Sequence, residues 1–193
     1  MSVPDDAGRV LLPLARGAIA ERLGLRAPDV ERADWLDEPG ASFVTLTIGD
    51  RLRGCIGTIL AHRPLGDDVV ANARHAAFDD SRFAPLRADE FGAVTLEVSV
   101  LTAPDPVRFT SRDDLLARLR PGTDGLIVRA VGRRATFLPQ VWEKLPDPGR
   151  FVEQLLRKAG LPESWWEPDE LVVERYGVRA WSEPDGYESK GRG

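Results

Sequence analysis

The segment Arg51–Gly57 constrains the fold of this chain more than any other, because it combines a strand-like pattern with two glycines and the only cysteine. Cys55 lies between Gly54 and Gly57, and two arginines precede it. A glycine inside a strand adds backbone entropy and packs no side chain, so two of them suggest that another group approaches this backbone closely. Free cysteine is commonly a small buried hydrophobe, but neighbouring arginines on the same face would favour the thiolate. The segment alone leaves both interpretations open.

The composition of the chain disfavours several classes of protein, among them membrane-spanning, secreted and nucleic-acid-binding proteins. The chain has 193 residues and a hydrophobic content of 42%, which is enough for one sizeable core. A single cysteine forms no internal disulfide, no apolar stretch approaches the roughly 20 residues of a membrane span, and the acidic start does not resemble a signal peptide. We therefore predict a cytoplasmic protein that does not bind membranes. The net charge of -5 disfavours nucleic acid as a partner.

The sequence predicts neither a cofactor nor a metal site. Two histidines and one cysteine do not form a zinc-binding cluster. A glycine-rich phosphate loop with a lysine is also missing, so nucleotide binding is unsupported.

Hydrophobic periodicity predicts helices and strands in mixed order. Helices are predicted up to Leu23, after Ser111 as N-cap, and over residues 65–78 and 148–159; the predicted strands are 43–48, 51–57, 94–101, 125–130, 135–138 and 171–181. Antiparallel hairpins mixed with separated helices indicate an α+β fold, with a mixed, largely antiparallel sheet and flanking helices.

The hairpin over residues 43–57 has two possible registers. A two-residue loop pairs Ile48 with Arg51, whereas a three-residue loop pairs Leu46 with Leu52. Because strand side chains alternate with period two, each register fixes every side chain on one face or the other. We favour the second register, since it separates apolar from polar side chains. It places Val44, Leu46, Leu52 and Ile56 on one face, and Phe43, Thr45, Thr47, Arg51, Arg53 and Cys55 on the other.

Several segments of the chain resemble one family. The run Leu52–Gly57, LRGCIG, resembles the signature of the AMMECR domain family, whose prokaryotic members are called AmmeMemoRadiSam system protein A. Further resemblances to this family are FVTL (43–46), AAFDDSRF (76–83), LEVSVL (96–101), GLIV (125–128), FLPQV (137–141) and KAGL (158–161). The resemblance spans about residues 8–182, which is nearly the whole chain.

The resemblance implies a mixed fold with a larger and a smaller lobe, and it implies no settled reaction. We expect one AMMECR-type domain over residues 8–182, whose lobes share one core, with flexible tails over residues 1–7 and 185–193. The family name also implies a Memo-type protein and a radical SAM protein as partners. Memo-type proteins are similar to extradiol dioxygenases. This chain has neither their metal ligands nor an iron–sulfur cysteine cluster, so we assign any such chemistry to the partners.

A ligand-binding cleft is predicted around Cys55. Glu97 lies on the polar face of the 94–101 strand and would pair with Arg53 if that face meets the cysteine. Asp80 and Arg82 follow a helix, where they form either a mutual ion pair or part of a ligand site. The amide of Gln140 would bind a ligand or a turn carbonyl. The predicted cleft comprises Arg53, Gly54, Cys55, Gly57, Asp80, Arg82, Glu97 and Gln140.

Two functions of different classes remain. The favoured one is a partner module that binds a peptide or a small ligand. The alternative is a thiol-dependent enzyme component, with Cys55 as the candidate catalytic residue. Such an enzyme usually needs a base near the thiol, and neither His62 nor His75 has diagnostic spacing. The sequence does not decide whether any reaction is catalysed.

Overall fold

The protein forms two compact units in the computed structural model, which describes residues 3–184. One unit consists of the chain up to Leu101 and from Arg179 onward, and the other is Thr102–Val178. Each unit contains two α-helices and a four-stranded sheet, so the predicted α+β class is confirmed. The expected single shared core is wrong, because each unit buries its helices against its own sheet in a separate hydrophobic cluster. That residues 8–182 form one domain stays a prediction.

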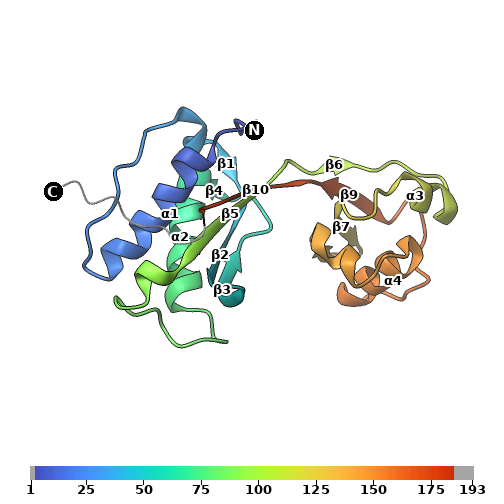
Figure 1. The fold of residues 1–193 in the computed structure, drawn as a ribbon. Coiled ribbons are helices and arrows are strands. Elements are labelled where there is room, and N and C mark those ends of the chain that lie inside the picture. The colour runs from blue at the N-terminus through green and yellow to red at the C-terminus, as the bar shows by residue number, and fades with distance from the viewer. Residues whose placement is uncertain (1–2, 185–193) are drawn as a thin grey trace. The chain divides into compact units, whose positions relative to one another are not determined.

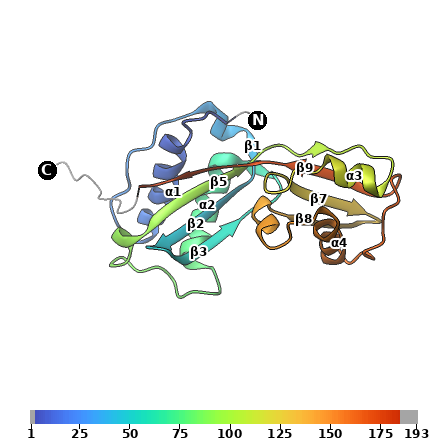
Figure 2. The ribbon, with the colours of Figure 1, turned by 45° about the vertical axis from the view of Figure 1, so that its right-hand side comes forward.

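The first unit packs two helices against one face of its sheet (Figures 1 and 2). The sheet order is β10–β5–β2–β3, and a separate two-stranded pair joins β1 to β4. The elements are α1 (Gly8–Arg22), α2 (Leu65–Phe78), β1 (Pro39–Gly40), β2 (Ser42–Ile48), β3 (Arg51–Gly57), β4 (Arg63–Pro64), β5 (Thr95–Leu101) and β10 (Val178–Ser182), with 3-10 turns over Asp34–Asp37 and Phe91–Ala93.

Local sequence signals account for these elements. α2 has the predicted bounds, and Asp67 and Asp68 in its first turn favour the positive end of the helix dipole. α1 ends just before Gly24, whose φ of 70° lies in the left-handed region that favours glycine. On β5, the residues Leu96 and Val98 are buried against the helices, and the alternating Thr and Glu positions are half-buried on the other face. The predicted alternation of this strand is confirmed.

The hairpin of β2 and β3 adopts the register that the sequence disfavoured. Gly49, with a φ of 56°, begins a two-residue turn, and Ile48 pairs with Arg51. A β-bulge then shifts the register, so that Leu46 faces Gly54 rather than the predicted Leu52. Beyond the bulge the faces are as predicted, with Val44 opposite Ile56 on the helix side and Thr45 opposite Cys55 on the other side. The prediction was wrong for Arg51 and Leu52, because a single strand pattern does not show an extra residue.

The N-terminal segment is packed rather than a free tail over its described part. Val3 and Ala7 are buried in the first core, which contradicts the predicted flexible tail for residues 3–7. The indole of Trp181 on β10 donates a hydrogen bond to the backbone oxygen of Asp5. The predicted tail over residues 185–193 lies outside the described residues, as do residues 1 and 2.

A buried ion pair ties the segment after β10 to α1. The Arg16 Nε donates to Glu183 Oε1 over 2.6 Å, and both side chains are 3% exposed. The Glu183 carboxylate also accepts from the backbone nitrogen of Leu96, and its own backbone nitrogen donates to the Leu96 oxygen. Glu183, near the end of the described residues, therefore links α1 to β5.

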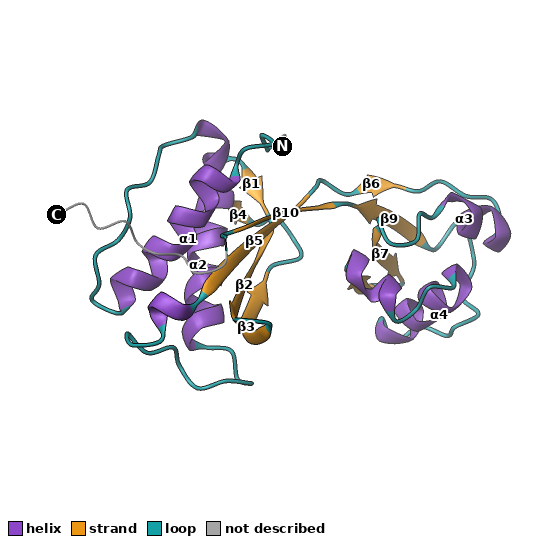
Figure 3. Ribbon diagram, viewed as in Figure 1, coloured by secondary structure: helices purple, strands orange, loops and turns teal. Residues whose placement is uncertain are grey.

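The second unit places α3 and α4 against its own sheet (Figure 3). Its sheet order is β6–β9–β7–β8. Its elements are α3 (Arg112–Arg118), α4 (Pro148–Lys158), β6 (Asp105–Pro106), β7 (Gly125–Ala130), β8 (Arg133–Phe137), β9 (Val172–Tyr176) and a 3-10 helix, η3 (Pro139–Glu143). The Ser111 hydroxyl accepts from the Asp114 backbone nitrogen at the start of α3, which confirms the predicted cap.

The predicted final strand over residues 171–181 is two strands in two sheets. β9 pairs with β7 in the second unit, while β10 joins β5 in the first, and Gly177 separates them. The sequence predicted one strand here, whereas the chain changes sheets at Gly177. Among residues 3–184, no helix has the length and apolar character needed to cross a membrane.

Candidate functional site

Both glycines of the LRGCIG segment are explained by packing within the first unit. A Cβ on Gly54 would lie 2.1 Å from the backbone oxygen of Ala76, so the α2 backbone rests directly on β3. A Cβ on Gly57 would lie 2.1 Å from the ring of Phe43, its cross-strand partner. The sequence predicted a close approach to this backbone, and the approaching groups are a helix and an aromatic ring. Their place in a ligand cleft stays a prediction.

A row of polar side chains crosses the sheet on the side opposite the helices. Thr45 faces Cys55 on one side and Glu97 on the other. We call this surface, formed by Phe43, Thr45, Cys55, Gly57, Glu97 and Ser99, the Cys55 face. Thr45, Cys55 and Glu97 are all half-buried, so water or a ligand reaches part of each side chain. The predicted polar face of β5 thus meets the cysteine face in one sheet.

Hydroxyl groups are the hydrogen-bond donors of this face. Thr45 Oγ1 donates to Cys55 Sγ over 3.3 Å. The Glu97 carboxylate accepts from Ser182 over 3.0 Å and, more weakly, from Ser99 over 3.5 Å. The sequence placed Thr45 beside Cys55 but not in the site, and it missed Ser182 because β10 had no visible partner strand. The alternation of β5 was the signal that pointed to Glu97.

Asp80 and Arg82 hold the outer edge of β3 at Cys55. Asp80 is buried, and its Oδ2 accepts from the Cys55 backbone nitrogen over 3.0 Å. Arg82 Nη2 donates to the Cys55 backbone oxygen over 3.1 Å and to Asp80 Oδ2 over 2.7 Å. The Arg82 hydrogen bond, with help from the Cys55 N–H, holds the pKa of the Asp80 carboxyl well below its usual range. The mutual ion pair considered from sequence is present, and it also satisfies both backbone groups of Cys55.

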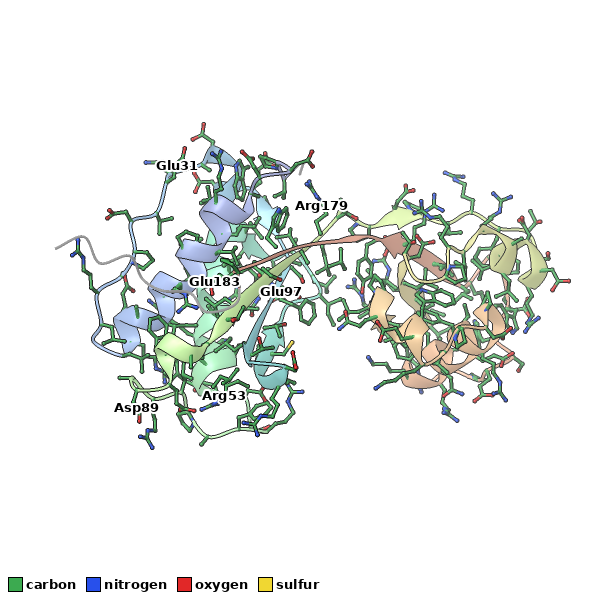
Figure 4. The ribbon with its side chains drawn as sticks, viewed as in Figure 1. Glu31, Arg53, Asp89, Glu97, Arg179 and Glu183 are labelled. Carbon is green, nitrogen blue, oxygen red and sulfur yellow. The ribbon has the colours of Figure 1, made fainter. Side chains whose placement is uncertain are left out.

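Arg53 does not join Glu97. Its guanidinium pairs with Glu90 over 3.2 Å, and this hydrogen bond lowers the pKa of the Glu90 carboxyl. Figure 4 shows Arg53 well away from Glu97, toward the loop that carries Asp89. The predicted Arg53–Glu97 pair is therefore wrong. Arg53 is the extra residue of the bulge, and the bulge takes it out of the strand's alternation.

Gln140, His62 and His75 lie outside the strands that form the Cys55 face. Gln140 is an exposed residue of η3 in the second unit, and its place in a cleft stays a prediction. The His62 ring bonds to the Leu60 backbone oxygen of its own loop. His75 is exposed on α2, which covers the other face of the sheet. Within residues 3–184 no group of His, Cys, Asp and Glu is arranged to hold a metal ion.

Comparison with known proteins identifies the family. The AMMECR1 family profile matches residues 12–181. The chain belongs to the AMMECR1 family. A crystal structure of the uncharacterized protein PH0010 from Pyrococcus horikoshii is similar, with a TM-score of 0.75 and 31% identity over 95% of each chain.

Other AMMECR1 relatives come from archaea. A protein of Methanothermobacter thermautotrophicus is 38% identical over 183 residues, which cover 92% of this chain and 95% of the relative. Protein Ta0236 of Thermoplasma acidophilum is 34% identical over 184 residues, which cover 93% and 89% of the two chains. The predicted family is confirmed. These names state no reaction, so AMMECR1 membership supports the fold and leaves the chemistry to the site itself.

Proposed function

We propose that this AMMECR1-family protein is a binding module whose ligand, a peptide or a small molecule, rests on the Cys55 face. The observation that carries the proposal is the half-buried row of Thr45, Cys55 and Glu97 across the middle strands. A thiol, a hydroxyl and a carboxylate together offer donors and acceptors for a polar ligand. The row also has a rigid support, because α2 contacts Gly54 directly from behind.

The edge of β3 argues for binding on the face rather than by strand addition. A peptide that extends the sheet would hydrogen-bond to the outward N–H and C=O groups of the edge strand. At Cys55 both groups already bond to the Asp80–Arg82 pair. A ligand therefore reaches the thiol from the side of the Thr45 hydroxyl, across the face of the sheet.

The family resemblance supplies the partners of this proposal. We infer that the module acts with a Memo-type protein and a radical SAM protein, and that it holds a ligand on which they act. Sedimentation of this protein mixed with the purified partners of the same organism tests the association. A complex with either partner supports it, and three independent species at micromolar concentrations contradict it.

A thiol-dependent enzyme component is the second candidate. The Thr45 hydroxyl donates a hydrogen bond to the Cys55 sulfur over 3.3 Å, so the thiol lies beside a polar group. Arg82 donates to the Cys55 backbone oxygen, with its charge paired to Asp80. Against this candidate, the two histidines bond elsewhere or lie on α2, so neither is a general base for the thiol. We therefore rank binding above catalysis.

An NMR titration tests the proposed binding on the Cys55 face. The 15N-labelled protein is titrated with a library of acetylated tripeptides and small amines, carboxylates and alcohols. We expect the amide shifts to cluster at Thr45, Cys55 and Glu97 and to persist in Cys55→Ala. Thr45→Arg, which covers the row, should abolish them, whereas Thr123→Arg, at an exposed position of the second unit, should not. Shifts that cluster elsewhere and ignore Thr45→Arg would contradict the proposal.

A further inference from the structure

Among the described residues of the first unit, the half-buried Glu97 carboxylate differs from the buried carboxylates in having no cationic partner. Buried Asp68, Asp80 and Glu183 each form an ion pair with an arginine. Glu97 is half-buried, yet over the described part of the chain its hydrogen bonds come from the hydroxyls of Ser99 and Ser182 alone. A carboxylate whose hydrogen bonds come from neutral hydroxyls keeps a negative charge that a nearby cation would compensate.

The surroundings of Glu97 define what kind of cation fits. Thr45 lies beside it and Cys55 one strand further, so two strand spacings of roughly 5 Å separate the carboxylate from the thiol. Phe43 lies two residues before Thr45 on β2 and therefore on the same face. Its ring covers Gly57 and offers an apolar surface. An organic ammonium group with a short carbon chain would place its charge at Glu97 and its chain over Thr45.

We propose that the ligand of the Cys55 face carries a protonated amino group, which Glu97 binds. This inference rests on the proposed function and names the substrate class of the same site. The amino group belongs either to a peptide, as an amino terminus or a lysine side chain, or to a free amine. Both sources share the chemistry of an ammonium on an apolar chain, and the experiment below separates them.

Because the chain has one cysteine, the rates at which charged reagents modify Cys55 report the charge around it. Cys55 is treated with two methanethiosulfonates of similar size, the cationic trimethylammonium-ethyl and the anionic sulfonato-ethyl reagent, each of which forms a mixed disulfide only there. Glu97→Gln should lower the ratio of the cationic to the anionic rate about threefold to tenfold, since one charge at roughly 10 Å has been removed. Glu97→Asp should keep the ratio. Glu21→Gln, an equal charge change on exposed α1, should leave the ratio within about twofold.

Protection of the thiol tests ligand binding directly. The neutral reagent N-ethylmaleimide labels Cys55 in the presence of 1,5-diaminopentane, pentanoate or pentanol at millimolar concentration. We expect the diamine to slow labelling at least twofold in the native protein and not in Glu97→Gln, whose melting temperature confirms folding. An acetylated Ala-Lys-Ala amide then separates a peptide source from a free amine, because only one of the two should protect at tenfold lower concentration.

The outcomes distinguish this inference from the proposed function. If pentanoate protects as well as the diamine, or if Glu97→Gln leaves protection and the rate ratio unchanged, the ammonium proposal is wrong and the Cys55 face remains a binding site. If no compound protects and the tripeptide titration perturbs amides elsewhere, both proposals fall together. Protection by the diamine that depends on Glu97 supports both.

Discussion

The sheets of the two units share one device and use it differently. In each, an aromatic ring lies across a glycine of the neighbouring strand: Phe43 covers Gly57 in the first unit, and Tyr176 covers Gly125 in the second. In the second unit the tyrosine is buried, and its hydroxyl bonds to Thr136 and to the Phe137 backbone oxygen. Burial raises the pKa of Tyr176 above its ordinary value.

The corresponding surface of the first unit is less buried. Phe43 has no hydroxyl to bond to a neighbouring strand, and the next row holds Cys55, Thr45 and Glu97 half-buried. In the second unit the hydroxyls of Tyr176 and Thr136 are satisfied internally, whereas the first unit keeps a thiol and a carboxylate partly exposed. An aromatic ring packed over a glycine is thus part of a buried, hydrogen-bonded sheet surface in the second unit, and it lies beside a half-buried candidate site in the first.

The largest expected effect is at Gly54, where the first unit depends on a helix backbone touching a strand. Gly54→Ala places a methyl group 2.1 Å from the Ala76 oxygen, so α2 must move away from β3. We expect a loss of about 3 kcal/mol or more in the free energy of unfolding, measured by urea denaturation. Gly92→Ala is the matched control, because nothing lies within 4 Å of its Cβ position. A stable Gly54→Ala protein would show that the contact is loose.

The two covered glycines should respond differently. Gly125→Ala forces aside a buried ring held by hydrogen bonds, and we expect a loss of about 2–3 kcal/mol in unfolding free energy. Gly57→Ala displaces Phe43, which is half-buried and has no such bonds, so about 1 kcal/mol is expected. Equal losses in parallel denaturation curves would mean that the two aromatic covers are equivalent, against the comparison above.

Asp80 should make the first unit sensitive to acid. Its pKa is lowered in the folded state, so its contribution to stability is complete above the unfolded value of about 3.9 and is lost as pH falls further. Asp80→Asn should lower the free energy of unfolding by about 2 kcal/mol at pH 7, since the Arg82 and Cys55 bonds lose a charged acceptor. Denaturation at pH 7 and pH 3 should show the variant and the natural protein converging in acid. A constant gap would place the acid sensitivity elsewhere.

Removal of the thiol should have the smallest effect. Cys55→Ala loses a half-buried sulfur and one weak bond from Thr45, so we expect a change below about 1 kcal/mol in unfolding free energy. Thr136→Ala, in the closed sheet, loses bonds to Leu126 and Tyr176 and should be the more damaging change in the same assay. The reverse order would indicate that the Cys55 face is structural.

The sequence predicted the helices and most strands, because their signals are local. Periodicity placed α2 within its observed bounds, and the Ser111 cap was visible in the order of residues. The register of β2 and β3 was not accessible in the same way. Its bulge at Arg53 is accompanied by an ion pair with Glu90, thirty-seven positions later, and no strand pattern contains that contact.

The candidate site was partly predictable for the same reason. The alternation of β5 put Glu97 on the polar face, and the Asp80–Arg82 pair was one of two interpretations considered. That this pair binds the Cys55 backbone required knowing that β3 is an edge strand, which is a property of the whole sheet. The two-sheet path of β9 and β10 was hidden, because only Gly177 separates the two strands and the sequence does not show which sheet each of them joins.

The return of β10 to the first unit has a consequence for synthesis of the protein. The second unit is an insertion within the first, so its residues leave the ribosome before the first sheet receives its last strand. Until Glu183 emerges, its own hydrogen bonds to the Arg16 side chain and the Leu96 backbone are not formed in the nascent chain. The amino-terminal unit is therefore not the first to be completed: β9 of the inserted unit leaves the ribosome before β10, so the first sheet receives its last strand after the second sheet has received its own.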